Sequence, residues 1–375
     1  MIFLPDCLSF PLAGRGAAWS ARLVRDQEVG GSNPPAPTTL KETLLKVLLF
    51  QTAFLGDLIL TSPLIKSLKK TFPDSEVHLV VRKGLESVFN GFSAVDRIIP
   101  FDKKGVWKFS KKLRQEGYSL AVSPHRSHRT ALILFLSRIP RRIGYDKAGF
   151  SFLYTDTVSH EFRRELHEVN RLLNLLKPLE AEHSVVYDRE VELPLSREEF
   201  EENLKKFSLK ESAYAVLAPG SVWPTKAWLP EYFAEVGKYL LKKGIPVVIV
   251  GSKADYRYCK KVFREMDGAA VNLCGKTSLK EFFAVIKGAK LLISNDSSPV
   301  HVAAAFKTPV IEIYGATIPD FGFFPYGPGK FVELKGLPCR PCGLHGGKKC
   351  PEGHFRCMVD LKPELVIREI DKSFL

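Results

Sequence analysis

The stretch KLLISNDSSPVHVAAAFKTPVIEIYG, residues 290–315, decides the fold. Its apolar run Leu291–Ile293 is of the kind that a buried parallel strand shows. A polar turn over residues 294–298 follows, and the Ala-rich run 300–306 predicts a short helix. A second apolar strand is predicted at 310–314. Strand, turn, helix and strand make one βαβ unit, which indicates a parallel sheet.

The polar turn of this unit is a candidate ligand site, because open α/β sheets bind ligands at the carboxyl ends of their strands. Pro299 suits the first position of the helix, and the free N–H groups of Ser297 and Ser298 at that helix start would bind an anion. Two plainer interpretations stand beside this one. The turn is equally consistent with a capped connection that binds nothing, and His301 with a packed helix residue.

Composition indicates a globular protein with anionic partners. The 375 residues are enough for two domains, and Lys and Arg exceed Asp and Glu by 55 to 41, a net charge of +14. Such a balance favours nucleic acid, phosphorylated sugars or an anionic membrane face. No apolar run reaches the ~20 residues that a membrane span needs. The absence of an RRM, zinc-finger or helix-turn-helix signature weighs against nucleic acid.

Short apolar runs alternate with helical patterns along the chain, which predicts two Rossmann-like parallel sheets. A polar stretch at 180–199 separates the two halves. Strands are predicted at 46–50, 77–81, 97–101, 119–123, 214–218, 246–250 and 271–274, besides the two in the opening unit. Helices are predicted at 58–72, 85–90, 106–116, 165–176, 230–243, 279–287 and 363–374, with Pro63 requiring a start near Ser62 or a kink.

Polar residues follow several of these strands. In the first half, Gly56 permits close approach of a ligand, and Asp57 could cap a helix or act as a general base. Arg126 and Arg129 follow the strand at 119–123 and suit a phosphate or carboxylate, although a solvated basic loop is the plainer interpretation. Arg138, Arg141 and Arg142 are expected to add positive charge nearby.

In the second half, the loop PGSVWPTKAW (219–228) carries Ser221, Thr225 and Lys226, and the lysine could neutralise a phosphate. Asp255, after the strand at 246–250, could hydrogen-bond a ribose diol. The chain has no G-x-G-x-x-G or Walker A string, which argues against ordinary dinucleotide or P-loop chemistry.

Two further segments stand apart. Residues 1–42 lack periodicity and predict an extension outside the fold; the string GGSNPPAPT (30–38) resembles a translated tRNA T-arm, so a start near residues 40–47 is expected, with a genuine disordered extension as the alternative. A cysteine cluster is formed by Cys339, Cys342, Cys350 and Cys357. Its count and first spacing resemble a structural zinc site, while disulfides and free thiols are the alternatives.

Five strings in order along the chain resemble the ADP-heptose:lipopolysaccharide heptosyltransferases of glycosyltransferase family 9, on the heptosyltransferase II branch. The strings are GDLILTSPLIKSLKKTFP, PHRSHRTALILFL with RIGY, LAPGSVWPTKAWLPEYFAEV, VVIVGS and SNDSSPVHVAAAFKTPVIEIYG. The resemblance implies an α/β GT-B fold, with two Rossmann-like domains and a cleft between them. It places an acceptor-binding domain at 43–190 and a donor-binding domain at 191–375, which includes the cysteine block 339–357 and a final helix that packs back across the cleft.

The resemblance also implies roles for single residues. Asp57 matches the catalytic base, and Lys226 the lysine that contacts the ADP phosphates. Arg126 and Arg129 fall in the acceptor half. The donor set is Gly56, Ser221, Thr225, Lys226, Asp255, Asp296, Ser297, Ser298 and His301, in which Ser298 replaces the usual Gly of D-[ST]-G-x-x-H and Asp255 a frequent Glu.

The implied activity is inverting transfer of heptose from ADP-heptose to the lipid-anchored lipopolysaccharide inner core. No cofactor is expected for the transfer, and the cysteine block is expected to be structural. The implied location is the cytoplasm, with peripheral contact at the inner membrane, and no nucleic-acid partner. The alternatives are a GT-B transferase with another nucleotide-sugar donor and, from a different class, a basic nucleic-acid-binding module that uses the cysteine cluster.

Overall fold

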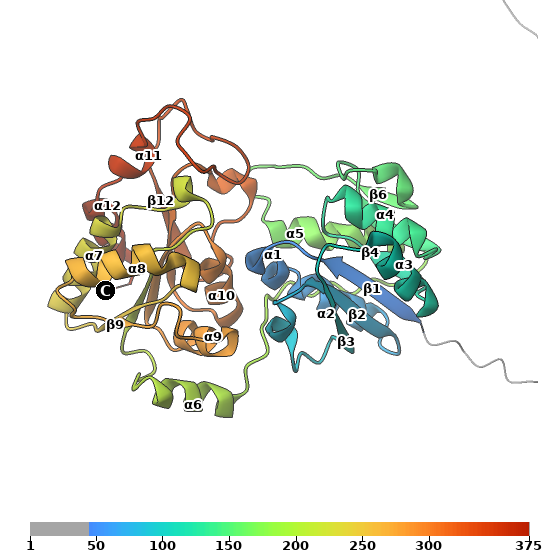
Figure 1. The fold of residues 1–375 in the computed structure, drawn as a ribbon, viewed down its shortest axis with the longest axis horizontal. Coiled ribbons are helices and arrows are strands. Elements are labelled where there is room, and N and C mark those ends of the chain that lie inside the picture. The colour runs from blue at the N-terminus through green and yellow to red at the C-terminus, as the bar shows by residue number, and fades with distance from the viewer. Residues whose placement is uncertain (1–44, 375) are drawn as a thin grey trace, which may run out of the picture. The chain divides into compact units, whose positions relative to one another are not determined.

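The computed structural model of the protein describes residues 45–374, which belong to one compact unit. The predicted extension at 1–42 lies outside the described residues. Two parallel six-stranded sheets organise the unit (Figure 1). Within this range, none of the helices combines the length and the apolarity that a membrane span requires.

The first sheet has the strand order β3-β2-β1-β4-β5-β6. Every residue of β1 except Lys46 is buried, as expected for a central strand covered on both faces. The predicted strands of this half are confirmed, but the sequence did not indicate β5 and β6, whose residues are largely polar. The strands are β1 (Lys46–Gln51), β2 (Glu76–Arg82), β3 (Arg97–Phe101), β4 (Leu120–Val122), β5 (Arg141–Tyr145) and β6 (Asp156–Val158).

The helix predicted at 58–72 is two helices. The first, α1, ends at Leu60, and α2 begins at Ser62 with Pro63 in its first turn, where the missing N–H of proline breaks no hydrogen bond. The helices of this half are α1 (Leu55–Leu60), α2 (Ser62–Thr71), η1 (Glu86–Phe89), α3 (Val106–Gln115), α4 (His128–Leu136), η2 (Ser151–Leu153), α5 (Glu168–Leu173) and η3 (Asn174–Leu179).

The second sheet has the order β12-β11-β10-β7-β8-β9. The opening βαβ unit of the sequence is confirmed as β10, α10 and β11, all residues of both strands being buried. The strands are β7 (Ala215–Ala218), β8 (Val247–Ile249), β9 (Val271–Asn272), β10 (Leu291–Asn295), β11 (Val310–Tyr314) and β12 (Gly329–Glu333). The helices are α6 (Arg197–Lys206), η4 (Pro224–Lys226), α7 (Pro230–Lys242), η5 (Lys253–Asp255), α8 (Tyr256–Glu265), α9 (Leu279–Lys287), α10 (Ser298–Phe306), η6 (Pro319–Phe321), α11 (Arg356–Val359) and α12 (Pro363–Ser373).

Helices α1 and α10 bring the two sheets together (Figure 1). Leu58 of α1 and Val300 of α10 are buried in one continuous hydrophobic cluster. A second connection joins the start of α5 to the segment 321–324. There the N–H of Glu168 donates to the carbonyl of Gly322 at 2.7 Å, and His167 Nε2 donates to the carbonyl of Phe324 at 2.9 Å.

Two expectations from the sequence are wrong. The final helix α12 packs against α7, β11 and β12 of its own sheet, with Val366 and Ile370 in that sheet's core, and does not cross the cleft. Arg141 and Arg142 lie at the amino end of β5, whereas the loop that carries Arg126 follows the carboxyl end of the neighbouring strand β4. Parallel strands place these ends at opposite edges of the sheet.

Candidate active site

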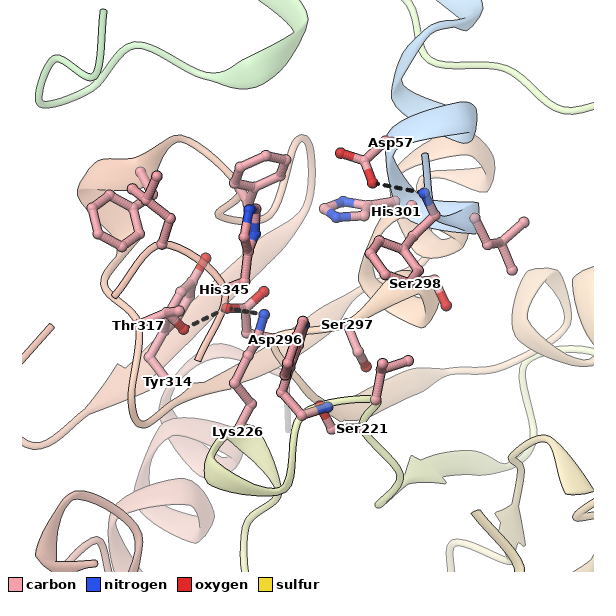
Figure 2. A pocket seen from close by; sticks show the side chains of 18 of the residues that line it. Asp57, Ser221, Lys226, Asp296, Ser297, Ser298, His301, Tyr314, Thr317 and His345 are labelled. Atoms are coloured by element: carbon pink, nitrogen blue, oxygen red, sulfur yellow. Dashed lines mark hydrogen bonds and ion pairs between the residues drawn. The ribbon is translucent and has the colours of Figure 1, made fainter. Parts of the chain in front are cut away.

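A cavity between α1 and α10 collects most of the predicted donor residues (Figure 2). They come from three loops that follow the carboxyl ends of β1, β7 and β10, as the rule for ligand sites in open parallel sheets predicts. Positions more than 240 residues apart in sequence thus share one wall. The predicted residues that line it are Gly56, Asp57, Ser221, Lys226, Asp296, Ser297, Ser298 and His301.

Asp57 stands at the third position of α1. One carboxylate oxygen, Oδ2, accepts a hydrogen bond from the N–H of Phe54 at 3.2 Å, so the residue caps its helix as the sequence suggested. Burial raises the pKa of the Asp57 carboxyl, opposed by backbone N–H groups and by the nearby His345 and Lys226. A carboxyl with a raised pKa that still faces a cavity has the properties of a general base.

Lys226 and Asp296 form a buried ion pair at 2.6 Å, with side chains 13% and 9% exposed. The same oxygen, Asp296 Oδ2, accepts a hydrogen bond from the hydroxyl of Thr317 at 2.6 Å. Asn295 fixes the loop that carries the lysine, because its amide oxygen accepts from the N–H of Trp228 at 2.9 Å and its amide nitrogen donates to the carbonyl of Pro219 at 2.9 Å. The ammonium is therefore held at the cavity wall by a fixed partner.

The start of α10 presents its backbone to the same cavity. Ser297 is extended and its side chain does not cap the helix; the hydroxyl donates to the carbonyl of Asn295 at 3.2 Å instead. The amide groups of the first turn and the helix dipole therefore favour an anion here. Ser298, where the family pattern has glycine, lines the cavity as well.

His301 is buried one turn further along α10. Its exposed fraction is 5%, its Nδ1 has no hydrogen-bond partner among the described residues, and burial lowers its pKa to about 4. The imidazole is consequently neutral near pH 7. Gly56 explains how it fits, since a Cβ at that position would lie 2.6 Å from His301 Cδ2.

A second cavity adjoins the first on the side of the first sheet, and its lining includes three cations and the carboxyl groups of Asp57 and Glu168. Arg126 lines it, as predicted for the acceptor side, whereas Arg129 does not. Burial, assisted by neighbouring cations, lowers the pKa of His125 and His160 to about 4 in each case, so these imidazoles add no charge near pH 7.

Arg82 and Lys103 also line the second cavity, and the sequence interpretation missed both. Arg82 ends β2 and Lys103 follows β3. Their position after strands of the predicted sheet was the signal that could have found them.

Two predicted donor residues lie outside the cavity walls. The hydroxyl of Thr225 is engaged with the backbone of Gly347: it accepts from the N–H at 2.7 Å and donates to the carbonyl at 3.0 Å. Asp255 accepts hydrogen bonds from the N–H and hydroxyl of Ser252 at 2.8 and 2.6 Å. Both side chains therefore hold loops in place and are not part of the cavity lining.

Comparison with known proteins decides the family. A family model described as Glycosyltransferase family 9 (heptosyltransferase) matches residues 106–352, well over half of the 375-residue chain. The chain belongs to glycosyltransferase family 9. As a member of this family it is a glycosyltransferase, and the enzyme class indicated by the five sequence strings is confirmed.

Relatives of this family 9 enzyme match it along nearly their whole length. Lipopolysaccharide heptosyltransferase 2 of Escherichia coli K12 is 24% identical over 88% of this chain and 99% of its own. Lipooligosaccharide heptosyltransferase 2 of Campylobacter jejuni serotype O:6 is 28% identical over the same two shares, 88% and 99%.

Solved structures confirm the GT-B fold of the family 9 enzyme. A glycosyltransferase family 9 protein of Veillonella parvula superposes with a TM-score of 0.75, at 23% identity, over 88% of this chain and 97% of that one. The E. coli ADP-heptose lipopolysaccharide heptosyltransferase II superposes with a TM-score of 0.72, at 22% identity, over 88% and 98%.

The cysteine cluster of the family 9 enzyme consists of free thiols in this structure. Burial, with the other three thiols nearby, raises the pKa of Cys357 to about 11. Between residues 45 and 374, no three His, Cys, Asp or Glu side chains are arranged to hold one metal ion. The four thiols nevertheless lie in one neighbourhood.

Proposed function

We propose that the enzyme transfers heptose from ADP-heptose to the inner core of lipopolysaccharide. One observation supports this most directly: Asp57 lines both cavities. One of these holds an ammonium and a helix start suited to a diphosphate, and the other holds cations suited to an anionic sugar. A carboxylate at their junction is where a base for transfer between them is needed.

The donor diphosphate is proposed to bind between Lys226 and the start of α10. Its negative charge would displace the ammonium from part of its interaction with Asp296 and meet the backbone N–H groups of Ser297 and Ser298. Both groups are fixed before the substrate arrives, by the Asp296–Thr317 hydrogen bond and by the packing of α10. Such preorganised donors stabilise charge as it develops on the leaving ADP.

Transfer is proposed to proceed with inversion, in one displacement. An acceptor hydroxyl oxygen attacks the anomeric carbon of heptose while the bond from that carbon to the phosphate oxygen breaks. The hydroxyl proton passes to the carboxylate of Asp57, and the electron pair leaves with ADP. The raised pKa of Asp57 improves its strength as a base.

The acceptor is proposed to bind in the second cavity. Arg126, Arg82 and Lys103 line this cavity. The positive charge of Arg129 helps to lower the pKa of His125 and of Lys103, so Arg129 is proposed to add to the positive potential around the acceptor. Arginine matches carboxylate and phosphate groups with paired hydrogen bonds. The inner core of lipopolysaccharide carries such groups, so its charge is complementary to this cavity.

The test is release of ADP from ADP-heptose in the presence of a lipopolysaccharide inner-core acceptor. Asp57→Asn keeps the shape of the side chain but removes the base, and is expected to lower turnover by about 100- to 10,000-fold. Asp74→Asn is the matched control, because Asp74 is exposed and lines neither cavity. UDP- and GDP-sugars, run in parallel, test the alternative of another donor. Turnover that survives in Asp57→Asn would contradict the proposed base.

We further propose that the enzyme works at the cytoplasmic face of the inner membrane, where a lipid-anchored acceptor would be presented. Trp107 of α3 and Phe135 of α4 are 73% and 47% exposed. They line a groove together with the cations Lys111, Arg114, Arg138 and Arg142. Exposed aromatic rings among basic side chains suit an interface with anionic lipids.

Co-sedimentation with phosphatidylglycerol vesicles tests this face, with phosphatidylcholine vesicles as the neutral comparison. Trp107→Ser combined with Arg114→Gln should weaken binding to the anionic vesicles and leave the turnover of a soluble acceptor fragment unchanged. Equal binding of wild type and variant would exclude this surface.

The cysteine cluster is proposed to be structural. Its thiols bracket the segment that enters the cavities, and the N–H of Cys342 donates to the carbonyl of Ala316 at 2.8 Å. Elemental analysis of protein purified without chelator, together with a thiol count, shows whether the four cysteines bind zinc, form disulfides or remain free thiols.

A further inference from the structure

His345 and Asp57 are the two ionisable residues that line both the first and the second cavity. The two cavities have six lining residues in common, and only these two carry ionisable side chains; the six are Phe54, Asp57, Phe321, Phe323, Leu344 and His345. Figure 2 shows His345 entering the first cavity.

The chemistry of the junction differs from that of the cavities it joins. Three phenylalanines and a leucine line it, whereas Lys226 and Arg126 lie to either side, each in only one cavity. Apolar and aromatic walls with few polar groups suit an uncharged sugar better than a phosphate. The group that crosses from donor to acceptor is such a sugar.

The loop that carries His345 is hydrogen-bonded to the loop that carries Thr225 and Lys226. Besides the two hydrogen bonds through the hydroxyl of Thr225, the N–H of Thr225 donates to the carbonyl of Gly347 at 3.2 Å. Gly346 has φ +77°, and a Cβ there would lie 2.9 Å from Thr225 Oγ1 and 3.0 Å from Cγ of Lys226. Only glycine permits both this backbone and this close approach.

Arg340 holds the other end of the loop. Its guanidinium donates to the carbonyl of Thr317 at 2.7 Å and pairs with Glu333 at 3.1 Å, with 5% of its side chain exposed. It also donates to the carbonyls of Gly315 and Leu334. The position of His345 is thus fixed at both sides, as a binding residue requires.

We propose that His345 is a further substrate-contacting residue, whose imidazole hydrogen-bonds the transferred sugar at the junction of the two cavities. Thr225 and Arg340 are its positioning residues. The inference rests on the proposed function, because it takes the junction as the place of transfer.

Steady-state kinetics with ADP-heptose and the inner-core acceptor test the contact. His345→Ala should lower kcat by about 100-fold, as for loss of one preorganised donor, and leave the affinity for ADP within about threefold of wild type. His345→Gln, which can still donate, should recover part of the loss. His354→Ala is the control, because His354 is exposed in the same segment and lines neither cavity.

A double-mutant cycle tests whether Thr225 positions His345. Thr225→Val should lower kcat in the wild-type background and have little further effect in His345→Ala, while Thr225→Ser should behave as wild type. Additive losses would show that Thr225 acts by another route. Full activity in His345→Ala would overturn the proposed contact.

Histidine NMR of the ¹³C-labelled full chain gives a readout that does not depend on turnover. The His345 resonance, identified by its loss in His345→Ala, should shift with ADP-heptose well beyond its shift with ADP. An identical shift with both ligands would contradict the inference even in an active enzyme. Absence of ADP release by wild type would instead contradict the proposed function, and the NMR comparison would still decide whether His345 meets the sugar.

Discussion

Gly56 of α1 and His301 of α10 are in contact across the two sheets, so close that a Cβ on Gly56 would lie 2.6 Å from the imidazole Cδ2. The contact sets the separation of the two helices that carry the proposed base and the proposed diphosphate site. The absence of a side chain at position 56 is therefore part of the geometry of the active site.

Gly56→Ala is predicted to lower both stability and turnover, because either the buried imidazole or a whole helix must move. Overpacking of this kind costs about 1–3 kcal/mol of unfolding free energy. His301→Ala in the same chain should remove most of the added cost, since it removes the atom that the new methyl group meets. Chemical denaturation of the four proteins measures this coupling, and additive costs would contradict it.

Lys226→Met is predicted to be more damaging than loss of both members of the Lys226–Asp296 pair. Among the residues that the structure describes, the single change leaves a buried carboxylate with only Thr317 as a hydrogen-bond partner, which costs about 3–5 kcal/mol. Lys226→Met with Asp296→Asn should recover stability but not ADP binding. Thermal unfolding and ADP titration separate the two effects. A double variant no more stable than the single one would show that the pair is not the cause.

Arg126→Gln is predicted to raise the KM for the acceptor by about 10- to 100-fold, the range for hydrogen bonds to charged groups. The KM for ADP-heptose should stay unchanged, because Arg126 lines only the second cavity. Arg163→Gln is the control, since that side chain is 71% exposed. Equal changes in the two KM values would mean that Arg126 acts on the fold and not on the acceptor.

The pH dependence of turnover should report Asp57. The base must be ionised, and burial raises its pKa, so turnover should rise with pH through a midpoint above the ordinary aspartate range. A profile for kcat over pH 4–8 measures this limb. Asp57→Glu, which retains a carboxyl group, should keep a limb of the same sign, and a flat profile in the wild type would contradict the assignment.

Stability should fall as the pH is lowered from about 6.5 to about 4, the interval between the ordinary histidine pKa and the value of about 4 for buried His160. In that interval the unfolded chain binds the extra proton, so acid favours unfolding. His160→Phe keeps the ring that packs against Tyr145 at 4.7 Å and removes the titration. The midpoint temperature of this variant should depend less steeply on pH. The reason is that the variant loses the linked free energy of His160, which is at most about 3 kcal/mol. Equal slopes would show that His160 does not contribute.

Much of the architecture follows from local pattern alone. The apolar runs of β1 and β10 are buried on both faces, so their hydrophobicity carried the prediction. The loops after them were recognised because parallel strands place functional loops at one edge. By contrast, β5 and β6 escaped notice because their strand character comes from pairing, of β5 with β4 and of β6 with β5, and not from their own residues.

The sequence by itself determined the two Rossmann-like sheets and the family, and it named Asp57, Lys226 and His301 as candidates, because these depend on local periodicity and on motifs of adjacent residues. Only the tertiary structure decided which loops meet. It brought His345 to the junction and turned Thr225 away from it, since contacts between distant loops depend on how helices pack. That packing is set by features such as the missing side chain of Gly56, whose effect appears only when its neighbour across the cleft is known.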